Sequence, residues 1–444
     1  MNGFFHYFTS ALDPMSNLGF SRAFSELMSS EVLSWWLLFV LPFASVELPA
    51  IISWLVYLVK PAAIRPPLPI RPGRTEQPLV SVVIAGRNES ATIGQCIRGA
   101  LLCGYSNLEV IFVDDYSDDD SVAIARRAAL SVTRSRRDAD RVRIFPSPRR
   151  NGKPSSLNIG IRMARGEFIA ITDADSVIQY GAMQHWLLPF ADPRVGAVSA
   201  NIRVLNSTAG LLTRLQEIEY ALKFTLGRFV LARINLLNIV SGMGGLFRAE
   251  ILHRLGGFDT GLGDDTDMTT NIRKQRWKLG FSFDAVVWTT VPVTQDHLWR
   301  QRMRWRRNMI KIRVSKHRDQ FVLGRYGFAN ALLAVQLLLG RMLLPAVVLI
   351  GLLLATTENG PLDVPQIVVT FYWVIQIYLL IRMLIVRDIS QTPQPANFWL
   401  VFIYPFYYLW LMPPVLYAEI CELLRIGAKH PYVPDHVWQE IPWW

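Results

Sequence analysis

The chain has 444 residues, of which 51% are hydrophobic and only 18% are charged, and its formal net charge is +11. This composition argues against an ordinary soluble enzyme, and the charged middle of the chain argues against a protein that lies wholly within a membrane. We expect membrane segments near both ends and one soluble domain of about 250 residues between them, which is enough for a large single core.

The basic residues gather in the expected soluble part and beside the expected membrane segments. Such an excess suits cytoplasmic loops and an anionic substrate. Nucleic acid is not an expected partner, because the basic residues form no single stripe and no nucleic-acid motif occurs. The cysteines, Cys96, Cys103 and Cys421, include no C-x-x-C pair, so neither a zinc site nor a disulfide framework is predicted.

The N-terminal segment, 1–31, lacks the basic start and the small-residue cleavage site of a signal peptide. The following run, 32–59, is almost wholly apolar and is long enough to cross a bilayer as a helix. Basic residues come next, which places that side of the membrane in the cytoplasm. The stretch 60–78 is rich in proline and is interpreted as a semi-rigid linker.

Short apolar runs alternate with helical stretches from residue 79 to about residue 248. This alternation predicts an α/β domain with a Rossmann-like, mostly parallel sheet and helices on both faces. Neither G-x-G-x-x-G after the first strand nor G-x-x-x-x-G-K-[ST] occurs, which argues against the dinucleotide and P-loop interpretations. The expected strands are 79–85, 108–113, 142–145, 168–171 and 195–200, and the expected helices are 91–103, 121–131, 155–165 and 210–232.

The chain returns to a membrane-like composition after residue 308. We expect an interfacial segment at 311–327, then about three runs long enough to span within 328–420, and a tail at 421–444. A catalytic domain at 79–310 would thus lie between α-helical transmembrane segments. The expected C-terminal spans are 328–355, 364–386 and 398–420.

A D-x-D motif, Asp173 and Asp175, follows the short apolar run 168–171. Two carboxylates at a strand end can converge in the crevice where open α/β sheets bind ligands. Next to a diphosphate they suit Mg²⁺ or Mn²⁺, which prefer oxygen ligands. The structural alternative is that one of them caps a following helix.

Two further motifs suit a nucleotide. Asp115 follows the second expected strand, where a carboxylate can accept a hydrogen bond from a base or a ribose; the alternative is a turn rich in Asp and Ser. Lys153 ends the motif Arg-Arg-Asn-Gly-Lys before a helix, where backbone N–H groups and a mobile cation can bind a diphosphate. The alternative for this motif is a solvated basic loop.

The motif Gly-Asp-Asp-Thr-Asp, 263–267, opens a helix expected to continue through Lys274. Its acidic residues can simply stabilise the helix N-terminus. The functional interpretation is a general base, since transfer from an activated sugar needs a carboxylate to take the acceptor proton. A single base without a covalent nucleophile implies direct displacement with inversion.

The motif Gln-Arg-Met-Arg-Trp places Gln301, Arg304 and Trp305 on one face of a helix. Arg304 can offset the charge of a departing diphosphate, and Trp305 offers a flat surface to a sugar ring. The alternative is a purely juxtamembrane basic helix. The remaining arginines, Arg300, Arg302, Arg306 and Arg307, are expected elsewhere on the helix, against anionic lipid.

Taken together and in this order, these motifs resemble those of the processive family 2 glycosyltransferases, which include bacterial synthases of cellulose, chitin-like oligomers, hyaluronan and poly-N-acetylglucosamine. The resemblance implies a cytoplasmic GT-A domain in the bacterial inner membrane, a UDP-sugar donor, and Mg²⁺ or Mn²⁺. It also implies export of the polymer through the membrane helices, and export or accessory subunits are further expected partners. Gly-Asp-Asp, where cellulose synthases carry Glu before the base, is typical of the hyaluronan and chitin-type branch.

The resemblance also implies a role for each motif residue. Asn88, Glu89 and Asp115 would contact the nucleotide and Lys153 the diphosphate. Asp173 and Asp175 would hold the metal, with Asp173 also at the nucleotide, and Asp265, beside Asp264, would be the base. Gln301, Arg304 and Trp305 would cover the pyrophosphate and the acceptor sugar.

The function that these motifs predict is inverting, processive β-glycosyl transfer from a UDP-sugar to a growing polysaccharide. A rival hypothesis is transfer of a single sugar to a membrane lipid, as in ceramide glucosyltransferases, which resemble parts of the same series. A third is a transport or scaffold subunit with an inactive transferase domain. The product length separates the first two, and the absence of any turnover would indicate the third.

Overall fold

The computed structural model describes residues 77–132, 140–261, 263–322, 325–337, 364–389 and 398–424, together with Leu55, Val59 and His436. The chain divides into two compact units, one of Met1–Leu55 with Leu332–Tyr378 and one of Val56–Ala331 with Leu379–Trp444. Everything that follows on the sheet and the site concerns the second unit. Of the first unit, the structure describes Leu55 and parts of two helices, α15 (Phe328–Leu337) and α17 (Val364–Ile389).

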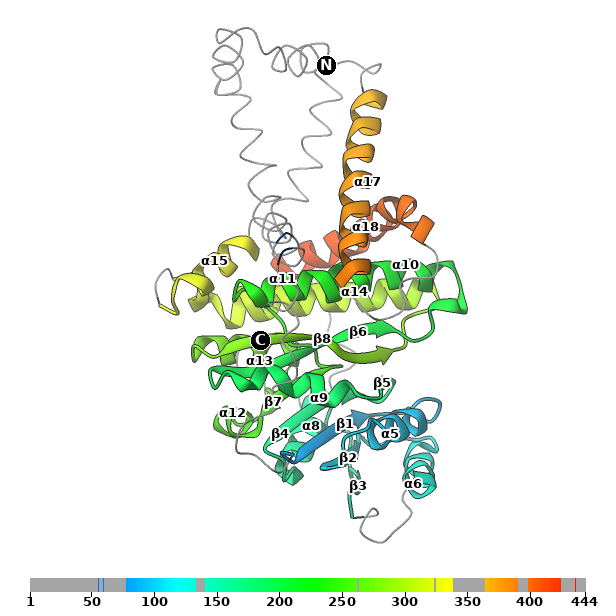
Figure 1. Ribbon diagram of the computed structural model, residues 1–444, viewed down its shortest axis with the longest axis vertical. Helices are drawn as coiled ribbons and strands as arrows, with labels where there is room; N and C mark the ends of the chain where they lie inside the picture. The colour runs from blue at the N-terminus through cyan, green and yellow to red at the C-terminus, as the bar shows by residue number, and fades with distance from the viewer. Residues whose placement is uncertain are drawn as a thin grey trace. The chain divides into compact units, whose positions relative to one another are not determined.

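One mixed sheet organises the second unit, with the strand order β3-β2-β1-β4-β7-β6-β8-β5 (Figure 1). The pairs within β3-β2-β1-β4 are all parallel. Beyond β4, the pairs β4–β7, β7–β6 and β8–β5 are antiparallel, and only β6–β8 is parallel. The strands are β1 Val80–Gly86, β2 Leu108–Asp114, β3 Val142–Pro146, β4 Phe168–Asp173, β5 Ser176–Ile178, β6 Val195–Val204, β7 Gly245–Arg248 and β8 Lys278–Thr289.

The expectation of a mostly parallel sheet is therefore correct for the first half of the domain and wrong for the second. The five strands expected from the sequence are all present, within a few residues of their expected bounds. The strands that add antiparallel pairs, β5 and β7, are three and four residues long. In strands this short, the order of apolar and polar residues fits a helix as well as a strand, so it does not predict either.

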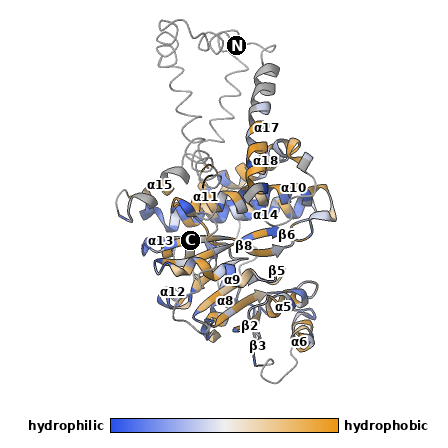
Figure 2. Ribbon diagram, in the orientation of Figure 1, coloured by the Kyte–Doolittle hydropathy of each residue, from blue (hydrophilic) through white to orange (hydrophobic). Residues whose placement is uncertain are grey.

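Both faces of the sheet are buried, as side-chain alternation along β1 shows. Val82 and Ile84 join one apolar cluster, whereas Val83 and Ala85 join another. Successive strand residues point to opposite faces, so the two clusters lie on opposite sides of the sheet. Figure 2 shows the hydrophobic colour that runs along β1 and β4. Burial on both faces explains why these strands are continuous apolar runs.

Helices cover the two faces. The first cluster includes residues of α5, α6 and α9, and the second includes residues of α8, α12 and α13. The expected helix at 210–232 is present as three consecutive pieces, the middle one, η3, being π-helical. The helices are α5 Ile93–Leu101, α6 Ser121–Val132, α8 Lys153–Met163, α9 Ala182–Leu187, α10 Leu211–Tyr220, η3 Ala221–Gly227, α11 Arg228–Arg233, α12 Ala249–Arg254, α13 Asp264–Lys274 and α14 Gln295–Ile310; short 3-10 turns lie at Leu188–Ala191 and Ser207–Ala209.

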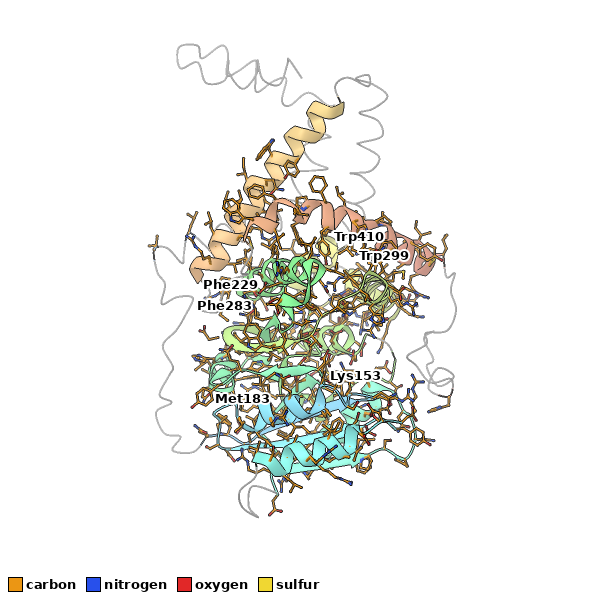
Figure 3. The ribbon with its side chains drawn as sticks, turned by 90° about the vertical axis from the view of Figure 1, so that its right-hand side faces the viewer. Lys153, Met183, Phe229, Phe283, Trp299 and Trp410 are labelled. Carbon is orange, nitrogen blue, oxygen red and sulfur yellow. The ribbon has the colours of Figure 1, made fainter. Side chains whose placement is uncertain are left out.

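Helix α14, which carries the Gln-x-x-Arg-Trp motif, packs against the C-terminal helix α18, Tyr404–Leu423. Trp299 of α14 lies beside Trp410 of α18 with 5.3 Å between ring centroids (Figure 3). Arg306 of α14 donates to Glu419 of α18 over 3.0 Å. A π-helical segment, η4 (Lys311–Lys316), and a 3-10 turn, η5 (Arg318–Phe321), follow α14 in the segment expected at the interface.

The predicted membrane layout lies largely outside the described residues. Of the expected span at 32–59, only Leu55 and Val59 are described, and of 328–355 only the part within α15, Phe328–Leu337. The run 364–386 lies within α17, Val364–Ile389, and 398–420 falls on a 3-10 turn, Phe398–Phe402, and α18. Among the helices of the described residues, none combines the length and the apolar character that a membrane crossing requires.

Candidate active site

A cavity of about 540 Å³ opens where β1, β2 and β4 end, between α8, α13 and α14. Gly86, Asp115 and Asp173, each at or next to the end of one of these strands, line it. This is the edge at which open α/β sheets bind ligands. Every predicted site residue except Asn88 lines this cavity: Glu89, Asp115, Lys153, Asp173, Asp175, Asp264, Asp265, Gln301, Arg304 and Trp305.

Asp115 holds the loop in front of α8. Its carboxylate accepts hydrogen bonds from the backbone N–H groups of Asn151 (2.7 Å) and Gly152 (2.9 Å), and from the hydroxyl of Ser156 (3.1 Å). The carboxylate therefore fixes the start of the helix that presents Lys153. Asp115 is 5% exposed and still reaches the cavity wall.

Asn88 is exposed and does not line the cavity. Its backbone is left-handed, with φ of 58°, a conformation that asparagine tolerates better than most residues. Its side-chain oxygen accepts from the N–H of Asp118, and its own N–H donates to Ser117. Asn88 thus braces the loop after β2, and its neighbour Glu89 lines the cavity.

Lys153 and the D-x-D carboxylates form the charged floor of the cavity. The ammonium of Lys153 donates to Asp173 over 2.5 Å. Burial alone would lower the pKa of Lys153, but the carboxylates of Asp173 and Asp264 raise it overall. The lysine is therefore a permanent cation in the cavity, placed where a diphosphate would meet the N-terminus of α8.

Asp175 is held by three hydroxyl groups. Thr290 donates to one of its oxygens over 3.0 Å, and Ser176 and Thr289 donate to the other over 3.2 Å and 3.5 Å. Burial, and next the charge of Asp173, raise the pKa of Asp175. A strand, β5, follows the motif directly, which excludes the alternative that Asp173 or Asp175 caps a helix.

The D-x-D pair fits a divalent cation by its chemistry. Among the described residues, no cluster of three or more His, Cys, Asp or Glu could hold a metal by itself. Two hard carboxylate ligands are what Mg²⁺ or Mn²⁺ needs when substrate phosphates and water supply the rest. Burial, and then the charge of Asp173, raise the pKa of Asp175, and a cation held between the two carboxylates would favour its ionised form.

Asp265 lies in the first turn of α13 and lines the cavity. Burial, and then the neighbouring Asp264, raise its pKa to about 6, although Lys153 opposes the shift. A carboxylate with a pKa near 6 is ionised at neutral pH and is a better proton acceptor than an ordinary aspartate. The N–H of Thr266 donates to it over 2.7 Å, which fixes its orientation.

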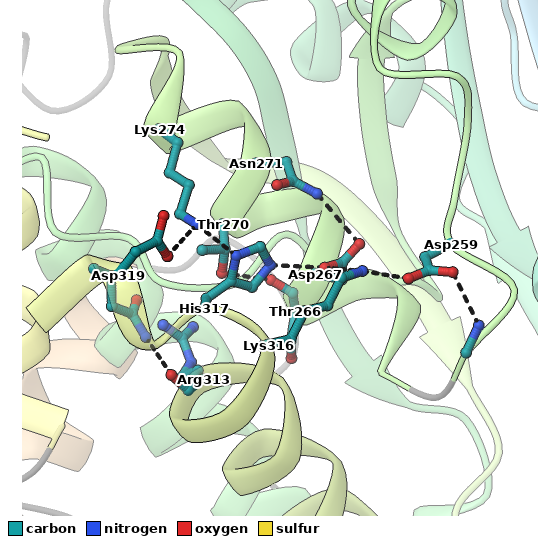
Figure 4. A network of polar contacts seen from close by, with 12 residues as sticks. Asp259, Thr266, Asp267, Thr270, Asn271, Lys274, Arg313, Lys316, His317 and Asp319 are labelled. Carbon is teal, nitrogen blue, oxygen red and sulfur yellow. Dashed lines mark hydrogen bonds and ion pairs between the residues drawn. The ribbon is translucent and has the colours of Figure 1, made fainter. Parts of the chain in front are cut away.

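Helix α13 is anchored by a network of polar contacts (Figure 4). Asp267 contacts the ring of His317 and the ammonium of Lys316, each at 2.7 Å. Lys274, at the other end of α13, donates to Asp319 over 2.6 Å. These contacts join α13 to η4 and η5 and leave Asp264 and Asp265 facing the cavity.

Helix α14 presents the expected face, because Gln301, Arg304 and Trp305 all line the cavity. The expectation for the other arginines is wrong for Arg302, Arg306 and Arg307. Arg302 pairs with Glu219, Arg306 with Glu419 and Arg307 with Glu422, since α14 packs between helices that carry these carboxylates. Arg300 is exposed and pairs with Asp296 one turn earlier.

Sequence reasoning missed several cavity residues, among them Tyr220, Met243 and Thr290. Thr290 follows directly on β8, a strand that the sequence analysis did not predict. Gly242 faces the same site, because a Cβ there would lie 3.7 Å from both Asp265 and Lys153. For Gly242 and Met243 the sequence does carry a signal, the glycine-rich run 241–245, which suggests that the backbone passes close to another group.

Comparison with known proteins fits this geometry. A family model described as "Glycosyltransferase like family 2" matches residues 77–308, just over half of the chain, and the chain belongs to this family. A poly-beta-1,6-N-acetyl-D-glucosamine synthase of Staphylococcus epidermidis is 30% identical over 234 residues, and one of Staphylococcus aureus (strain COL) is 27% identical over 228. Each match covers 51% of this chain and 53% of the relative, so the chain matches about half the length of these relatives.

Among solved structures, a mannosyltransferase from Pyrobaculum calidifontis, in complex with GDP-Man and Mn²⁺, is similar with a TM-score of 0.59 and 21% identity. The similarity covers 87% of this chain and 99% of that one. At this identity the likeness shows the fold, which is a GT-A-like α/β fold with a mixed sheet.

Proposed function

We propose that the chain is an inverting, processive β-glycosyltransferase, which polymerises a sugar from a UDP-sugar donor and exports the product through its membrane segments. The observation that supports this most is that residues of all five motifs, which extend over about 190 residues from Asp115 to Trp305, line one cavity. A shared cavity is what one reaction at one sugar carbon needs. The names of the matched relatives make N-acetylglucosamine the first sugar to test.

The donor would lie along the strand ends. Glu89 and Asp115 would border the nucleotide, and Lys153, at the N-terminus of α8, would contact the diphosphate. Arg304 would add a second cation on the opposite wall. A divalent cation on Asp173 and Asp175 would offset the negative charge that develops on the leaving diphosphate.

The transfer step is a direct displacement. Asp265 takes the proton from the acceptor hydroxyl as that oxygen forms a bond to the anomeric carbon of the donor. The bond from that carbon to the diphosphate oxygen breaks, and UDP leaves with the electron pair. Because the acceptor attacks from the face opposite the diphosphate, the configuration inverts. Trp305 would hold the acceptor ring by stacking.

A panel of labelled UDP-sugars tests the proposal. Protein in lipid vesicles is incubated with each donor, and the labelled product is sized on a gel. A ladder of long products from one donor supports polymerisation. A single sugar on a lipid would instead support the rival hypothesis of glycolipid synthesis, and no product or UDP release from any donor would contradict both.

A further inference from the structure

Glu219 is a buried carboxylate beside the proposed acceptor end of the cavity. It lies on α10, is 3% exposed, and accepts from three donors. Arg302 donates over 2.8 Å, Lys223 over 2.9 Å and Tyr407 over 3.0 Å. Burial alone would raise its pKa, but Arg302 and then Lys223 lower it to about 2, so the carboxylate is charged at every working pH.

Arg302 connects this carboxylate to two cavity residues. Its guanidinium lies over the ring of Trp305, 4.4 Å from the centroid, and donates to the side-chain oxygen of Gln301 over 3.1 Å. Arg302 is itself 6% exposed, so its position is set by its partners and not by solvent. A guanidinium over an indole covers one face of the ring, and Phe224 also lies near this indole, with 6.2 Å between the ring centroids. The part of Trp305 that lines the cavity is the part open to a sugar.

We propose that Glu219 and Arg302 are positioning residues for the acceptor sugar. Glu219 fixes Arg302, and Arg302 in turn fixes the ring of Trp305 and the amide of Gln301. The inference rests on the proposed function, in which Trp305 carries the acceptor. Neither residue lines the cavity, so both act through the two residues that do.

The variant Glu219→Gln tests this inference, because it keeps the size of the side chain and removes the charge that holds Arg302. With UDP-N-acetylglucosamine and a β-1,6-linked N-acetylglucosamine pentamer, or the pair that the donor panel selects, the KM for the acceptor should rise about tenfold. The KM for the donor should change less than about twofold, because Lys153 and the D-x-D pair are unaffected. A purely structural role would instead raise both KM values together.

Two more variants complete the test. Arg302→Lys keeps the ion pair with Glu219 but loses the planar stack, so the melting temperature should stay near that of the wild type while the acceptor KM rises. This variant carries the test if Glu219→Gln does not fold. Glu419→Gln is the matched control, since it removes the buried partner of another α14 arginine, Arg306, and should leave the acceptor KM unchanged.

An unchanged acceptor KM in Glu219→Gln or in Arg302→Lys would overturn the positioning role. An equal rise in Glu419→Gln would also overturn it, because the effect would then reflect a general loosening of α14. A wild-type protein that transfers no sugar contradicts the proposed function itself, whereas an active wild type with an unaffected Glu219→Gln contradicts only this inference.

Discussion

Asp265 carries an electrostatic cost. It lies beside Asp264 in the cavity wall, partly buried, and its pKa is raised to about 6. A rise of this size above the usual pKa of an aspartate corresponds to at most roughly 3 kcal/mol, and solvent that enters the cavity reduces the cost to on the order of 1 kcal/mol. Such a cost is typical of a side chain retained for chemistry and not for stability.

Replacing this carboxylate should therefore separate activity from stability. We expect Asp265→Asn to abolish transfer, to bind UDP with near wild-type affinity, and to melt at a higher temperature at pH 8. The gain in melting temperature should shrink as the pH falls from 6 towards 4, because the wild-type carboxyl then becomes neutral as well. Calorimetry and a thermal melt measure these effects, and wild-type turnover in the variant would contradict the assignment of the base.

The pH dependence of the wild type follows from the same group. Since the base works only as a carboxylate, the transfer rate should fall as the pH drops through about 6, towards tenfold per unit below it. An ordinary aspartate would keep full activity down to about pH 4. The measurement is the initial rate at saturating substrates from pH 4.5 to pH 8, and a rate that is flat over this range would exclude Asp265 as the titrating base.

For single residues, the sequence predicted which side chains lie together in the cavity, but it did not predict the buried partners that hold them in position. The D-x-D pair and Trp305 were recognisable because their spacing and residue types carry chemistry. The burial of Arg302 was not, because its partner, Glu219, lies 83 residues earlier on another helix. A local pattern contains no information on which carboxylate meets which arginine.

Helix α13 begins directly after a glycine that has little room for a side chain. Gly263 precedes the helix with φ of +79°, and a Cβ there would lie 2.8 Å from Ile312 of η4. Gly256 has a similar φ, +77°, but a Cβ there would meet nothing within 4 Å. The two glycines thus share the same backbone strain and differ in the room around them.

We therefore expect Gly263→Ala to lower the free energy of unfolding by about 1–3 kcal/mol more than Gly256→Ala does. Transfer should also fall in Gly263→Ala only, because the clash displaces the helix that carries Asp265. Denaturant titration and initial rates measure the two effects. Equal losses in both variants would mean that the approach of η4 to α13 is not constrained.

The elements that the sequence analysis missed differ in cause. β8 has 12 residues and pairs on both sides, and Leu279, Phe281 and Phe283 alternate with Gly280, Ser282 and Asp284, which is the period of a half-buried strand. Its sequence therefore carries a strand pattern that the sequence analysis left unassigned. β5 and β7 are too short to show such a pattern. The antiparallel pairs form between residues distant in sequence, so local propensity could not predict the strand order.

On the scale of the whole molecule, the site needs both halves of the sheet. The parallel half brings Asp115 and Asp173 to the cavity, and the C-terminal half brings Thr290, which holds Asp175. The D-x-D pair is thus shaped by strands distant in sequence. The two negative charges of this pair predict that the folded domain requires a divalent cation.

Removal of divalent cations should stop turnover. We expect excess EDTA to reduce transfer to background and added Mn²⁺ or Mg²⁺ to restore it, because Lys153 alone would otherwise offset the charge of both carboxylates beside the leaving diphosphate. Initial rates with and without the chelator measure this, with the added ion as the control. Full activity in excess EDTA would remove the metal role from Asp173 and Asp175.

The hydroxyl of Tyr407 connects the C-terminal helix to the wall of the cavity. Tyr407 belongs to α18 and donates to Glu219, the carboxylate that pairs with Arg302. A tilt or shift of α18 would therefore be passed to the indole of Trp305 through two side chains, those of Glu219 and Arg302. The position of the C-terminal helix and the shape of the cavity around Trp305 are thereby coupled.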